Sequence, residues 1–467
     1  MKKYVLGALP VLVVCFSFVV FQVAHGGLFT PPLCAILGVG CPEIEIRGFV
    51  APNYEPVREL FHQHFLDGKE VGASVVAYVN GEKVVELYGG VMDRSANAPF
   101  SERTLTTVWS SGKAVAAIAI GILVDRGLLS YDKPIADYWP EYAQNGKALF
   151  TVSDLLSHRG AIPWLEEAEA EEGGAKLLPL QLETALDEKA LSRLVEKSPA
   201  IWSHGEKRQM YHCIVGGFVL DQLVRRVDPQ KRSMARFIRE ELAEPLGIEF
   251  YLGLSEEEDP ELVSRLSTLY PMPLHQIFLR IIPFDVIPED YHFVMRPLVP
   301  SLQPETDLHL LRALKNSSSI ISRACSNVAF DPVKWLAADV PAAGGKSSAA
   351  SLAKLASVMA NGGEAHGVKL MSKETWQAAH VDQEARFDEA LLTNSIMTVG
   401  GFGKTQPEIY PDSRYYGWGG NGGSLFLWHP ELKIGFSYVM NAMHLRLWDH
   451  RSIPLARAVA ECASSQQ

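Results

Sequence analysis

The chain has 467 residues, of which 47% are hydrophobic and 21% charged, and these ordinary globular values exclude disorder, collagen and coiled coil as its main state. Its 43 Lys and Arg residues against 54 Asp and Glu give a net charge of −11, which disfavours nucleic acid as a partner because phosphate binding needs clustered positive charge. The length exceeds what one compact core usually takes, so we expect two packed subdomains or one large intertwined unit.

Residues 1–27 are predicted to be a signal peptide or a signal anchor. Lys2 and Lys3 precede a nearly continuous apolar run over residues 4–23, which is about long enough to span a bilayer. The Ala-His-Gly sequence at 24–26 is a mediocre cleavage site, so the cleaved and the uncleaved form both stay open. Either form sends the remaining chain into the extracellular space or the lumen of the secretory pathway, because the positive flank stays cytoplasmic.

Two weaker features agree with an exported chain. Cys34 and Cys41 are close enough in sequence to pair in an oxidising lumen, although a simply buried Cys34 is the alternative. Asn316 begins an Asn-Ser-Ser glycosylation sequon, a pattern that also arises by chance. Both cysteines fall within residues 28–45, which we interpret as a linker because prolines break any regular element there.

The first predicted elements after the linker are a helix over 54–66 and a β-hairpin. The hairpin strands, 74–79 and 83–88, flank Asn80-Gly81, and an Asn-Gly pair supplies the positive φ angles of a type I′ turn. A helix over 110–126 follows. It is apolar around nearly its whole circumference, so we expect it to be buried on all sides.

The middle of the chain shows mostly helical patterns separated by proline-rich loops, with one helix predicted over 233–246. Mixed patterns return after 340, in the order helix 348–361, strands 424–428 and 434–440, and helix 453–464. Strands at both ends with helices between them predict one sheet built from both termini and an inserted helical subdomain. The predicted α/β part covers about 46–115 and 335–467, and the helical part covers about 116–334.

Common catalytic signatures are either missing from the sequence or out of context. The sequence holds no Gly-x-Ser-x-Gly elbow, no P-loop and no His-Glu-x-x-His. A Gly-x-Gly-x-x-Gly pattern at Gly417 precedes a predicted strand instead of opening a helix, so a dinucleotide site is not expected. We predict no cofactor and no metal, since no cluster of metal ligands is evident.

Ser-x-x-Lys is the remaining candidate, and it occurs three times, beginning at Ser110, Ser130 and Ser351. The chemistry needs the hydroxyl and the amine on one helical face, one turn apart, in a dry site. The lysine of the second copy precedes a proline, which disfavours a helix, and the third copy lies on what we interpret as a solvated face. Ser110 and Lys113 instead open the apolar helix.

A lysine on an apolar helix is costly unless it has a partner or a task. To act as a base, Lys113 needs its pKa lowered from about 10.4 towards neutrality, which burial can do. The helix N-terminus would also direct the Ser110 amide towards an oxyanion. The alternative is that Lys113 extends to the surface and has no catalytic role.

Four short segments follow one another in an informative order. They are 108–114 (Val-Trp-Ser-Ser-Gly-Lys-Ala), 155–160 (Leu-Leu-Ser-His-Arg-Gly), 205–217 around Tyr211, and 417–424 (Gly-Trp-Gly-Gly-Asn-Gly-Gly-Ser). Together they resemble the serine β-lactamase-like family, in particular class C β-lactamases, family VIII carboxylesterases and animal β-lactamase-domain proteins. The resemblance implies a β-lactamase/transpeptidase-like α/β fold over 46–467, with an antiparallel sheet built from both chain ends, flanking helices and an inserted, mostly helical subdomain.

The resemblance also implies a role for each matching residue. Ser110 would be the acylated nucleophile, and Lys113 would share or relay its proton. Tyr211, as phenolate or hydroxyl, would complete the base and protonate the leaving group. The backbone amides of Ser110 and Asn421 would form the oxyanion hole. His158 is assigned to bracing a turn and not to catalysis.

Two departures from the family pattern bear on the substrate. Cys213 stands where the tyrosine motif often has an asparagine, so the amide that would bind a β-lactam side chain is missing. Trp418, Gly419 and Gly420 replace the Lys-Thr-Gly or His-x-Gly of relatives, so a β-lactam carboxylate lacks its cation. A tryptophan here resembles some family VIII esterases, and its apolar wall with one N–H donor suits a neutral ester or lactone. We expect these four residues to line the substrate pocket.

The expected function is a serine hydrolase that forms an acyl-enzyme on neutral esters or small amides, with weak or no β-lactamase activity. An acyltransferase would use the same acyl-enzyme with an acceptor other than water. A catalytically silent or self-assembling scaffold is the third alternative, because a shared fold does not guarantee turnover. The expected partner is a small molecule, and the uncleaved form would add a single membrane anchor. The sequence does not indicate an oligomeric state.

Overall fold

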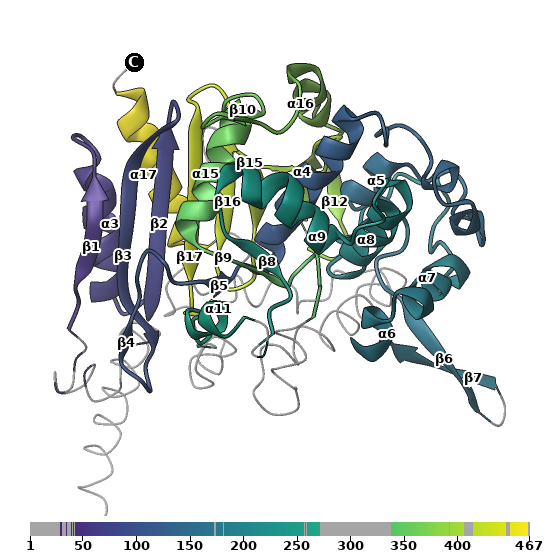
Figure 1. Cartoon of the computed structure of the whole chain (residues 1–467), viewed down its shortest axis with the longest axis horizontal. Helices are drawn as coiled ribbons and strands as arrows, with labels where there is room; N and C mark the ends of the chain where they lie inside the picture. Colours follow the sequence, from purple (N-terminus) through teal and green to yellow (C-terminus); the bar gives the residue numbers. More distant parts are fainter. Residues whose placement is uncertain are drawn as a thin grey trace, which may run out of the picture.

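The computed structural model is drawn in Figure 1. It describes positions 29, 34, 39, 41 and 257 and the ranges 43–171, 174–180, 182–255, 259–270, 338–391, 393–405, 414–444 and 449–465. The predicted signal segment and the Asn316 sequon lie outside these residues. Among the residues that are described, no helix has both the length and the apolar character needed to cross a membrane.

A large antiparallel sheet forms the centre of the molecule, and both ends of the chain contribute to it. Its strands lie in the order β1 (Ile46–Val50), β3 (Glu82–Asp93), β2 (Gly72–Val79), β17 (Ile434–Met440), β16 (Leu425–His429), β15 (Tyr416–Gly419), β14 (Gly403–Lys404), β13 (Thr393–Met397) and β12 (Arg386–Asp388), with β4 (Ala98–Pro99) paired to β3. Strand β17 pairs with β2 from Ile434 opposite Val79 to Met440 opposite Ala73. The predicted sheet from both termini is therefore confirmed.

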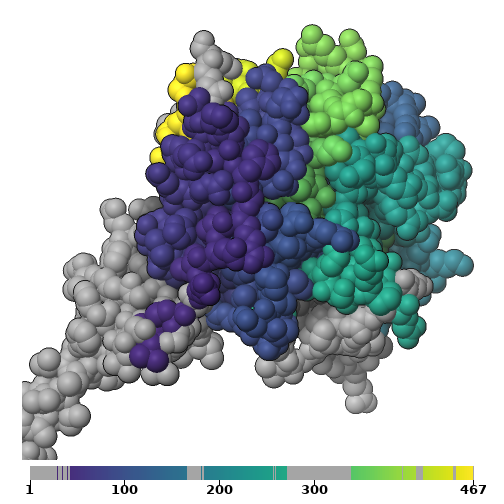
Figure 2. Space-filling model, turned by 60° about the vertical axis from the view of Figure 1, so that its left-hand side comes forward, coloured from purple at the N-terminus to yellow at the C-terminus, as the bar shows by residue number. Residues whose placement is uncertain are grey.

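The predicted hairpin is present as β2 and β3. Asn80 and Gly81 have φ angles of 51° and 85°, the positive values that a type I′ turn requires. Both strands extend beyond the predicted ranges, because β3 also pairs with β1 and β4 on its other side. Figure 2 shows the purple N-terminal part and the yellow C-terminal helix side by side, with the teal helical part on the other side of this view.

Helices cover both faces of the sheet, which alternate along each strand. Gly435 of β17 faces α15 (Ala349–Ala360), and a Cβ there would lie 2.3 Å from the backbone of that helix. Tyr438 points to the opposite face, where the Arg451 guanidinium lies 5.7 Å from its ring just before α17 (Ser452–Ser464). Helix α17 packs there beside α3 (Glu55–Leu66), and α15 lies across β17 in Figure 1.

The apolar helix is α4 (Gly112–Asp125), and eleven of its fourteen residues are buried, as predicted. It begins later than the sequence suggested, because Trp109–Ser111 form a 3-10 turn ahead of it. The helical part also contains α5 (Val152–Leu156), α6 (Leu182–Leu186), α7 (Glu188–Lys197), α8 (Val215–Val227), α9 (Met234–Ile238), α10 (Glu244–Leu246) and α11 (Pro260–Ser264). The helix predicted over 233–246 is interrupted by a π turn at Arg239–Ala243 and ends at Gly247, as expected.

The helical part also contains strands that the sequence patterns did not indicate. A hairpin of β6 (Glu166–Glu171) and β7 (Gly174–Pro179) projects from it in Figure 1. Strand β8 (Phe250–Leu252) joins β9 (Gly345–Ser347) and β5 (Thr106–Thr107) in a small sheet. That sheet ties the helical part to the segment just before Ser110. The remaining elements are β10 (Glu364–Ala365), β11 (Val368–Lys369) and α16 (Lys373–Ala379), with 3-10 turns at Ile135–Asp137 and Pro140–Ala143.

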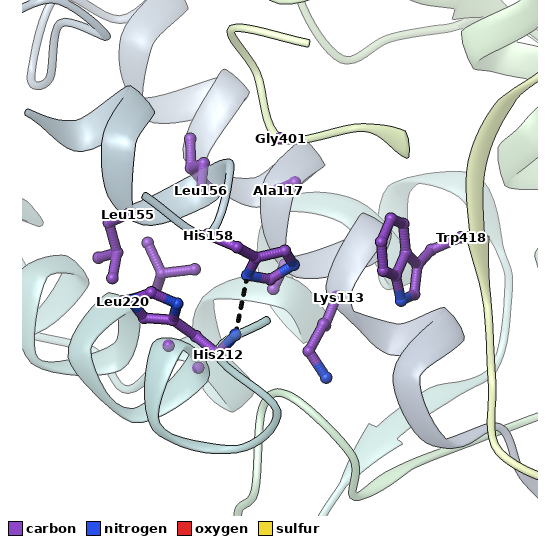
Figure 3. A pocket seen from close by; sticks show the side chains of 12 residues that line it. Lys113, Ala117, Leu155, Leu156, His158, His212, Leu220, Gly401 and Trp418 are labelled. Carbon is purple, nitrogen blue, oxygen red and sulfur yellow. Dashed lines mark hydrogen bonds between the residues drawn. The ribbon is translucent and has the colours of Figure 1, made fainter. Parts of the chain in front are cut away.

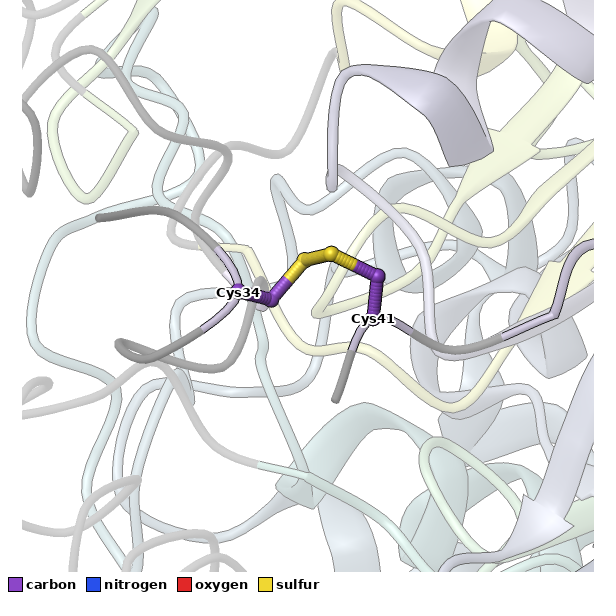
Figure 4. The surroundings of a disulfide bond; sticks show 2 residues. All are labelled: Cys34 and Cys41. Carbon is purple, nitrogen blue, oxygen red and sulfur yellow. A yellow bond between two sulfur atoms is a disulfide. The ribbon is translucent and has the colours of Figure 1, made fainter. Parts of the chain in front are cut away.

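The linker carries a disulfide. Cys34 and Cys41 are joined by an S–S bond with their Cα atoms 4.8 Å apart (Figure 4). The sequence left open whether these two cysteines pair or Cys34 is simply buried, and the structure has them paired.

Candidate active site

The nucleophile candidate lies in a tight turn between β5 and α4. Ser110 is the middle residue of the 3-10 turn, and 8% of its surface is exposed. The preceding Trp109 is buried and has a φ of 49°, a left-handed conformation that bulky residues rarely adopt. A backbone bond of 2.8 Å from the Val108 N–H to the Gly345 carbonyl holds the turn against β9. Strain of this kind persists where surrounding contacts enforce it, and it clusters at functional sites.

Lys113 lies one helical turn after Ser110, with its amine enclosed by protein. Its Nζ donates to Ser110 Oγ at 3.0 Å, to the Cys213 carbonyl at 2.7 Å and to the Ala342 carbonyl at 2.8 Å. An ammonium has three N–H donors, so these three acceptors satisfy it fully. The predicted surface-extending alternative is wrong, because the amine turns inward to the serine.

Burial lowers the pKa of Lys113 to about 8. An ammonium is more costly than a neutral amine in a poorly solvated site, and the fixed carbonyls offset only part of that cost. A sizeable fraction of Lys113 is therefore neutral near pH 8. The neutral amine has a free electron pair that can accept the proton of the Ser110 hydroxyl.

Tyr211 contacts the same serine. Its hydroxyl donates to Ser110 Oγ at 2.7 Å, and its ring centroid lies 4.8 Å from the Lys113 amine. Burial raises the pKa of Tyr211 well above its ordinary value. Tyr211 is consequently a phenol at neutral pH, and of the two forms left open by the sequence the structure favours the hydroxyl. Lys113 is then the group of this trio that can take up a proton near neutrality.

Aromatic side chains enclose the trio on one side. Trp418 stacks on Tyr211 with ring centroids 5.7 Å apart, and its Nε1–H donates to the Tyr211 hydroxyl oxygen at 3.4 Å. His158 packs edge-on against Tyr211 at 4.7 Å, and its Nδ1 accepts the backbone N–H of His212 at 3.3 Å. Burial keeps the pKa of His158 far below its usual range, so the ring is neutral. These contacts agree with the prediction that His158 braces a turn.

Asp388 holds the Tyr211 segment in place, and no sequence pattern pointed to it. Its Oδ1 accepts the backbone N–H groups of Tyr211, Ala390 and Leu391, each at 3.0 Å. The carboxylate is fully buried on β12, at the far end of the sheet order. Strand β12 therefore fixes the catalytic tyrosine candidate through one side chain that lies 177 positions away in sequence.

We expect Asp388→Ala to destabilise the protein by about 3 kcal/mol or more, because three buried N–H groups lose their acceptor at about 1 kcal/mol or more each. The ester-hydrolysis rate should also fall, since Tyr211 loses its backbone anchor. Urea unfolding and steady-state kinetics would measure the two effects. An Asp388→Ala variant with wild-type stability would show that this carboxylate does not anchor the tyrosine turn.

The third segment abuts the nucleophile turn directly. Ser111 Oγ donates to the Trp418 carbonyl at 3.3 Å, and Ser424 Oγ donates to the Val108 carbonyl at 2.8 Å. The two hydroxyls lie 3.1 Å apart. A Cβ on Gly420 would lie 2.3 Å from the Val108 carbonyl oxygen, so this close approach requires a glycine. The loop with the predicted oxyanion donor Asn421 is thus fixed against the turn with Ser110.

A small cavity lies beside Lys113, and Figure 3 shows it. Its volume is about 30 Å³, enough for one water molecule. Lys113, Trp418 and His212 line it together with Leu155 and Leu220, so it is mainly apolar. Among the described lining residues, Lys113 is the one with a side chain that is charged at neutral pH, because burial lowers the pKa of His212 to about 4.

Of the predicted pocket residues, Trp418 lines this cavity and Cys213 and Gly419 do not. Cys213 is a half-buried free cysteine, and its carbonyl binds the Lys113 amine. Gly419 is buried in β15, paired with Leu425 of β16. Gly420 contributes through the close approach of its backbone to the nucleophile turn.

The structure corrects the interpretation of the third Ser-x-x-Lys copy. Ser351 is buried, and its Oγ accepts the Glu249 N–H at 2.9 Å, while Lys354 donates to the Leu246 carbonyl at 2.6 Å. These residues therefore join α15 to the segment around β8, and the prediction of a solvated face is wrong. The error arose because polar neighbours along the sequence do not show which face of a helix is covered. In the second copy, Ser130 donates to Asp132.

A family model described as Beta-lactamase matches residues 57–459. The chain belongs to the Beta-lactamase family. It is 27% identical to the esterase/beta-lactamase LipL of Mycobacterium tuberculosis over 400 residues. The aligned part makes up 85% of this chain and 83% of LipL. The solved structure of a family VIII carboxylesterase has a TM-score of 0.71 at 28% identity, over 90% of this chain and 100% of that one. A penicillin-binding protein homologue from Caulobacter crescentus has a TM-score of 0.70 at the same identity and the same coverage of both chains.

Membership of the Beta-lactamase family confirms the resemblance and the fold class predicted from the four segments. The relatives match almost the whole described chain, so the fold is that of these proteins. Within it, the side chains of Lys113 and Tyr211, both of which were predicted, meet at Ser110 Oγ. The supporting contacts of Asp388 and of the Ser111–Ser424 pair were not predicted.

Proposed function

We propose that this member of the Beta-lactamase family is a serine hydrolase that cleaves neutral esters through an acyl-enzyme on Ser110. The observation that carries the proposal is the double contact of Ser110 Oγ, which lies 3.0 Å from the Lys113 amine and 2.7 Å from the Tyr211 hydroxyl. An amine with a pKa of about 8 can take up a proton, and a phenol can give one. The esterase names of its relatives agree with this chemistry.

In the acylation step, neutral Lys113 removes the proton of Ser110 while Oγ attacks the ester carbonyl carbon. The carbonyl oxygen gains negative charge, which the backbone amides of Ser110 and Asn421 stabilise. Tyr211 then donates its proton to the leaving alcohol oxygen as the C–O bond breaks, and the Lys113 ammonium returns a proton to Tyr211. Water then attacks the acyl carbonyl carbon and gives a proton to neutral Lys113. The bond to Ser110 Oγ breaks, the serine oxygen takes a proton back from the Lys113 ammonium, and the free acid is released.

Trp418 supports a neutral substrate. The family resemblance implies that members which hydrolyse β-lactams usually have a lysine in the third segment, and this chain has an indole 4% exposed at that place. Lys113 already donates to three protein acceptors, so it has no further N–H for a substrate carboxylate. A carboxylate on the substrate would remain without a cationic partner and would cost free energy to bury. We therefore propose weak or no β-lactamase activity.

A panel of neutral aryl esters, a lactone and a chromogenic cephalosporin tests the proposal. We expect turnover of the esters with release of the free acid, and no measurable turnover of the cephalosporin. If an added alcohol intercepts most of the acyl group as a new ester, the chain is an acyltransferase. Absence of turnover on every substrate by folded protein would contradict the proposed hydrolase.

Charge discrimination should depend on Trp418. We expect wild type to have a higher kcat/KM on a neutral ester than on its analogue with a terminal carboxylate. Trp418→Lys should change the ratio of these two kcat/KM values by about tenfold or more, because a charge-assisted hydrogen bond contributes about 1.5 kcal/mol or more. Trp418→Phe is the matched control, because it removes the N–H without adding charge and should leave the ratio as in wild type. Equal ratios in all three proteins would show that Trp418 does not set charge preference.

We also propose that the chain is exported, as a secreted or singly anchored protein. The disulfide between Cys34 and Cys41 supports this, because such bonds persist in oxidising compartments. Protease protection in sealed microsomes tests the proposal, since an exported chain resists digestion until detergent is added. Digestion without detergent would contradict it.

A further inference from the structure

A buried arginine lies beneath the loop that carries Asn421. Arg451 is completely inaccessible to solvent, and it sits between the third segment and the start of α17. Its Nη2 donates to the Gly422 carbonyl at 2.6 Å. On its other sides it forms ion pairs with Asp449 at 2.8 Å and with Glu70 at 2.9 Å. The proposed mechanism gives this arginine no role.

We propose that Arg451 is a positioning residue for the oxyanion hole: by holding the Gly422 carbonyl it sets the direction of the Asn421 N–H. The inference rests on the proposed hydrolase function and adds to it a residue outside the four family segments. It follows from how two peptide units of the loop are hydrogen-bonded to each other and to the arginine.

The first of these units contains the Gly422 carbonyl and the Gly423 N–H. Peptide units are planar and trans, so a carbonyl held in one direction fixes the N–H of the same unit in the opposite direction. Arg451 holds that carbonyl, and the Gly423 N–H then donates to the Gly420 carbonyl at 3.1 Å. Gly423 has a φ of 117°, which leaves the loop little resistance of its own to turning.

The second unit contains the Gly420 carbonyl and the Asn421 N–H. Because the Gly423 N–H holds this carbonyl, the direction of the Asn421 N–H is fixed by the same planarity. The other end of the loop is fixed by the Gly420 N–H, which donates to the Ser424 carbonyl at 2.8 Å. The predicted oxyanion donor is therefore two peptide planes away from the guanidinium.

The guanidinium is itself rigidly held. Its Nε donates to Asp449 Oδ1 and its Nη1 to Glu70 Oε2, and Tyr438 donates to the other oxygen of Glu70. All of these groups are buried. A planar fork with fixed partners suits this task better than a lysine, which is a flexible point charge. A Cβ on Gly423 would lie 2.6 Å from Nη2, so the loop fits tightly against the arginine.

A metal site at this position is disfavoured. His444, Asp449 and His450 bring donor atoms within 4.8 Å of one another. Both carboxylate oxygens of Asp449, however, already bind Arg451, and a divalent cation would meet the positive guanidinium. The cluster is better explained as an ion-pair network that anchors Arg451.

The test compares Arg451→Lys with Arg232→Lys. Arg232 is the matched control, because it is also buried and clamped by a carboxylate, with Asp228 at 2.9 Å, but it lies in the helical part without a contact to Gly422. In Arg451→Lys we expect kcat on a neutral ester to fall by about tenfold to 100-fold, with KM within about threefold, since the oxyanion hole acts on the transition state. Arg232→Lys should lose thermal stability while keeping kcat within about twofold of wild type.

The pH dependence separates positioning from general damage. Arg451→Lys should keep the wild-type midpoint of the pH–rate profile, because Lys113 is untouched. If Arg451→Lys does not fold, Glu70→Gln provides the test. This substitution keeps the shape of the Glu70 side chain but weakens its hydrogen bond with Arg451 Nη1. We expect kcat to fall by about threefold to tenfold. A folded Arg451→Lys, or failing that a folded Glu70→Gln, with wild-type kcat would overturn the inference. Inactive wild type would instead contradict the proposed function.

Discussion

Ser110→Ala should lower the rate of ester hydrolysis by a factor on the order of 10⁴ to 10⁶, as expected when a nucleophile is removed. The substitution deletes one hydroxyl, so the free energy of unfolding should change by about 1–2 kcal/mol at most. Steady-state kinetics and urea unfolding of the same preparations measure both quantities. Near-normal turnover by Ser110→Ala would exclude this serine as the nucleophile.

Ser351→Ala is the matched control for that result, because Ser351 begins another Ser-x-x-Lys sequence. Its Oγ is a buried acceptor for the Glu249 N–H, so its loss should cost about 1–3 kcal/mol of stability and leave turnover unchanged. Ser110→Ala is thus expected to lose turnover with little change in stability, and Ser351→Ala to lose stability with unchanged turnover. The reverse pattern, with Ser351→Ala inactive, would place the active site on α15.

The pH dependence of wild type should follow Lys113. The base must be neutral, and the pKa of Lys113 is lowered by burial to about 8. Below that value kcat/KM should rise about tenfold per pH unit as the ammonium loses its proton, and above it the rate should level off. A midpoint well below pH 7 would point to a different base.

Lys113→Met should lower kcat/KM by about 10² to 10⁴, the range expected for a general base, and should abolish the limb with its midpoint near pH 8. Lys354→Met is the control, because the Lys354 amine donates to a backbone carbonyl and has no contact with Ser110. Its pH profile should match wild type. A Lys113→Met variant with the wild-type profile would show that another group removes the serine proton.

The sequence was sufficient for the fold class, for the nucleophile and for the two side chains that contact it. Ser110 and Lys113 are one helical turn apart, so local periodicity alone places them together. Tyr211 is distant, and only the order of the four segments brought it into the site. The direction of the Lys113 amine could not be predicted, because it depends on the carbonyls of Cys213 and Ala342 in two other segments.

The supporting residues could not be predicted from the sequence for a different reason. A contact between distant positions, or with a backbone carbonyl, leaves no periodic pattern in the sequence. The supporting roles of Asp388, Ser424 and Arg451 depend on such contacts. Arg451 also lies outside the four short segments from which the family was predicted. The solvated-face prediction for Ser351 failed in the same way, because burial is decided by the neighbouring segment around β8.

If Ser110 is an activated nucleophile, a fluorophosphonate should modify it covalently. The intact mass of the folded protein would be measured after treatment, with wild type and Ser110→Ala side by side. We expect one covalent adduct on wild type and none on Ser110→Ala. An unmodified wild-type protein, or an adduct that persists in Ser110→Ala, would contradict this role of Ser110.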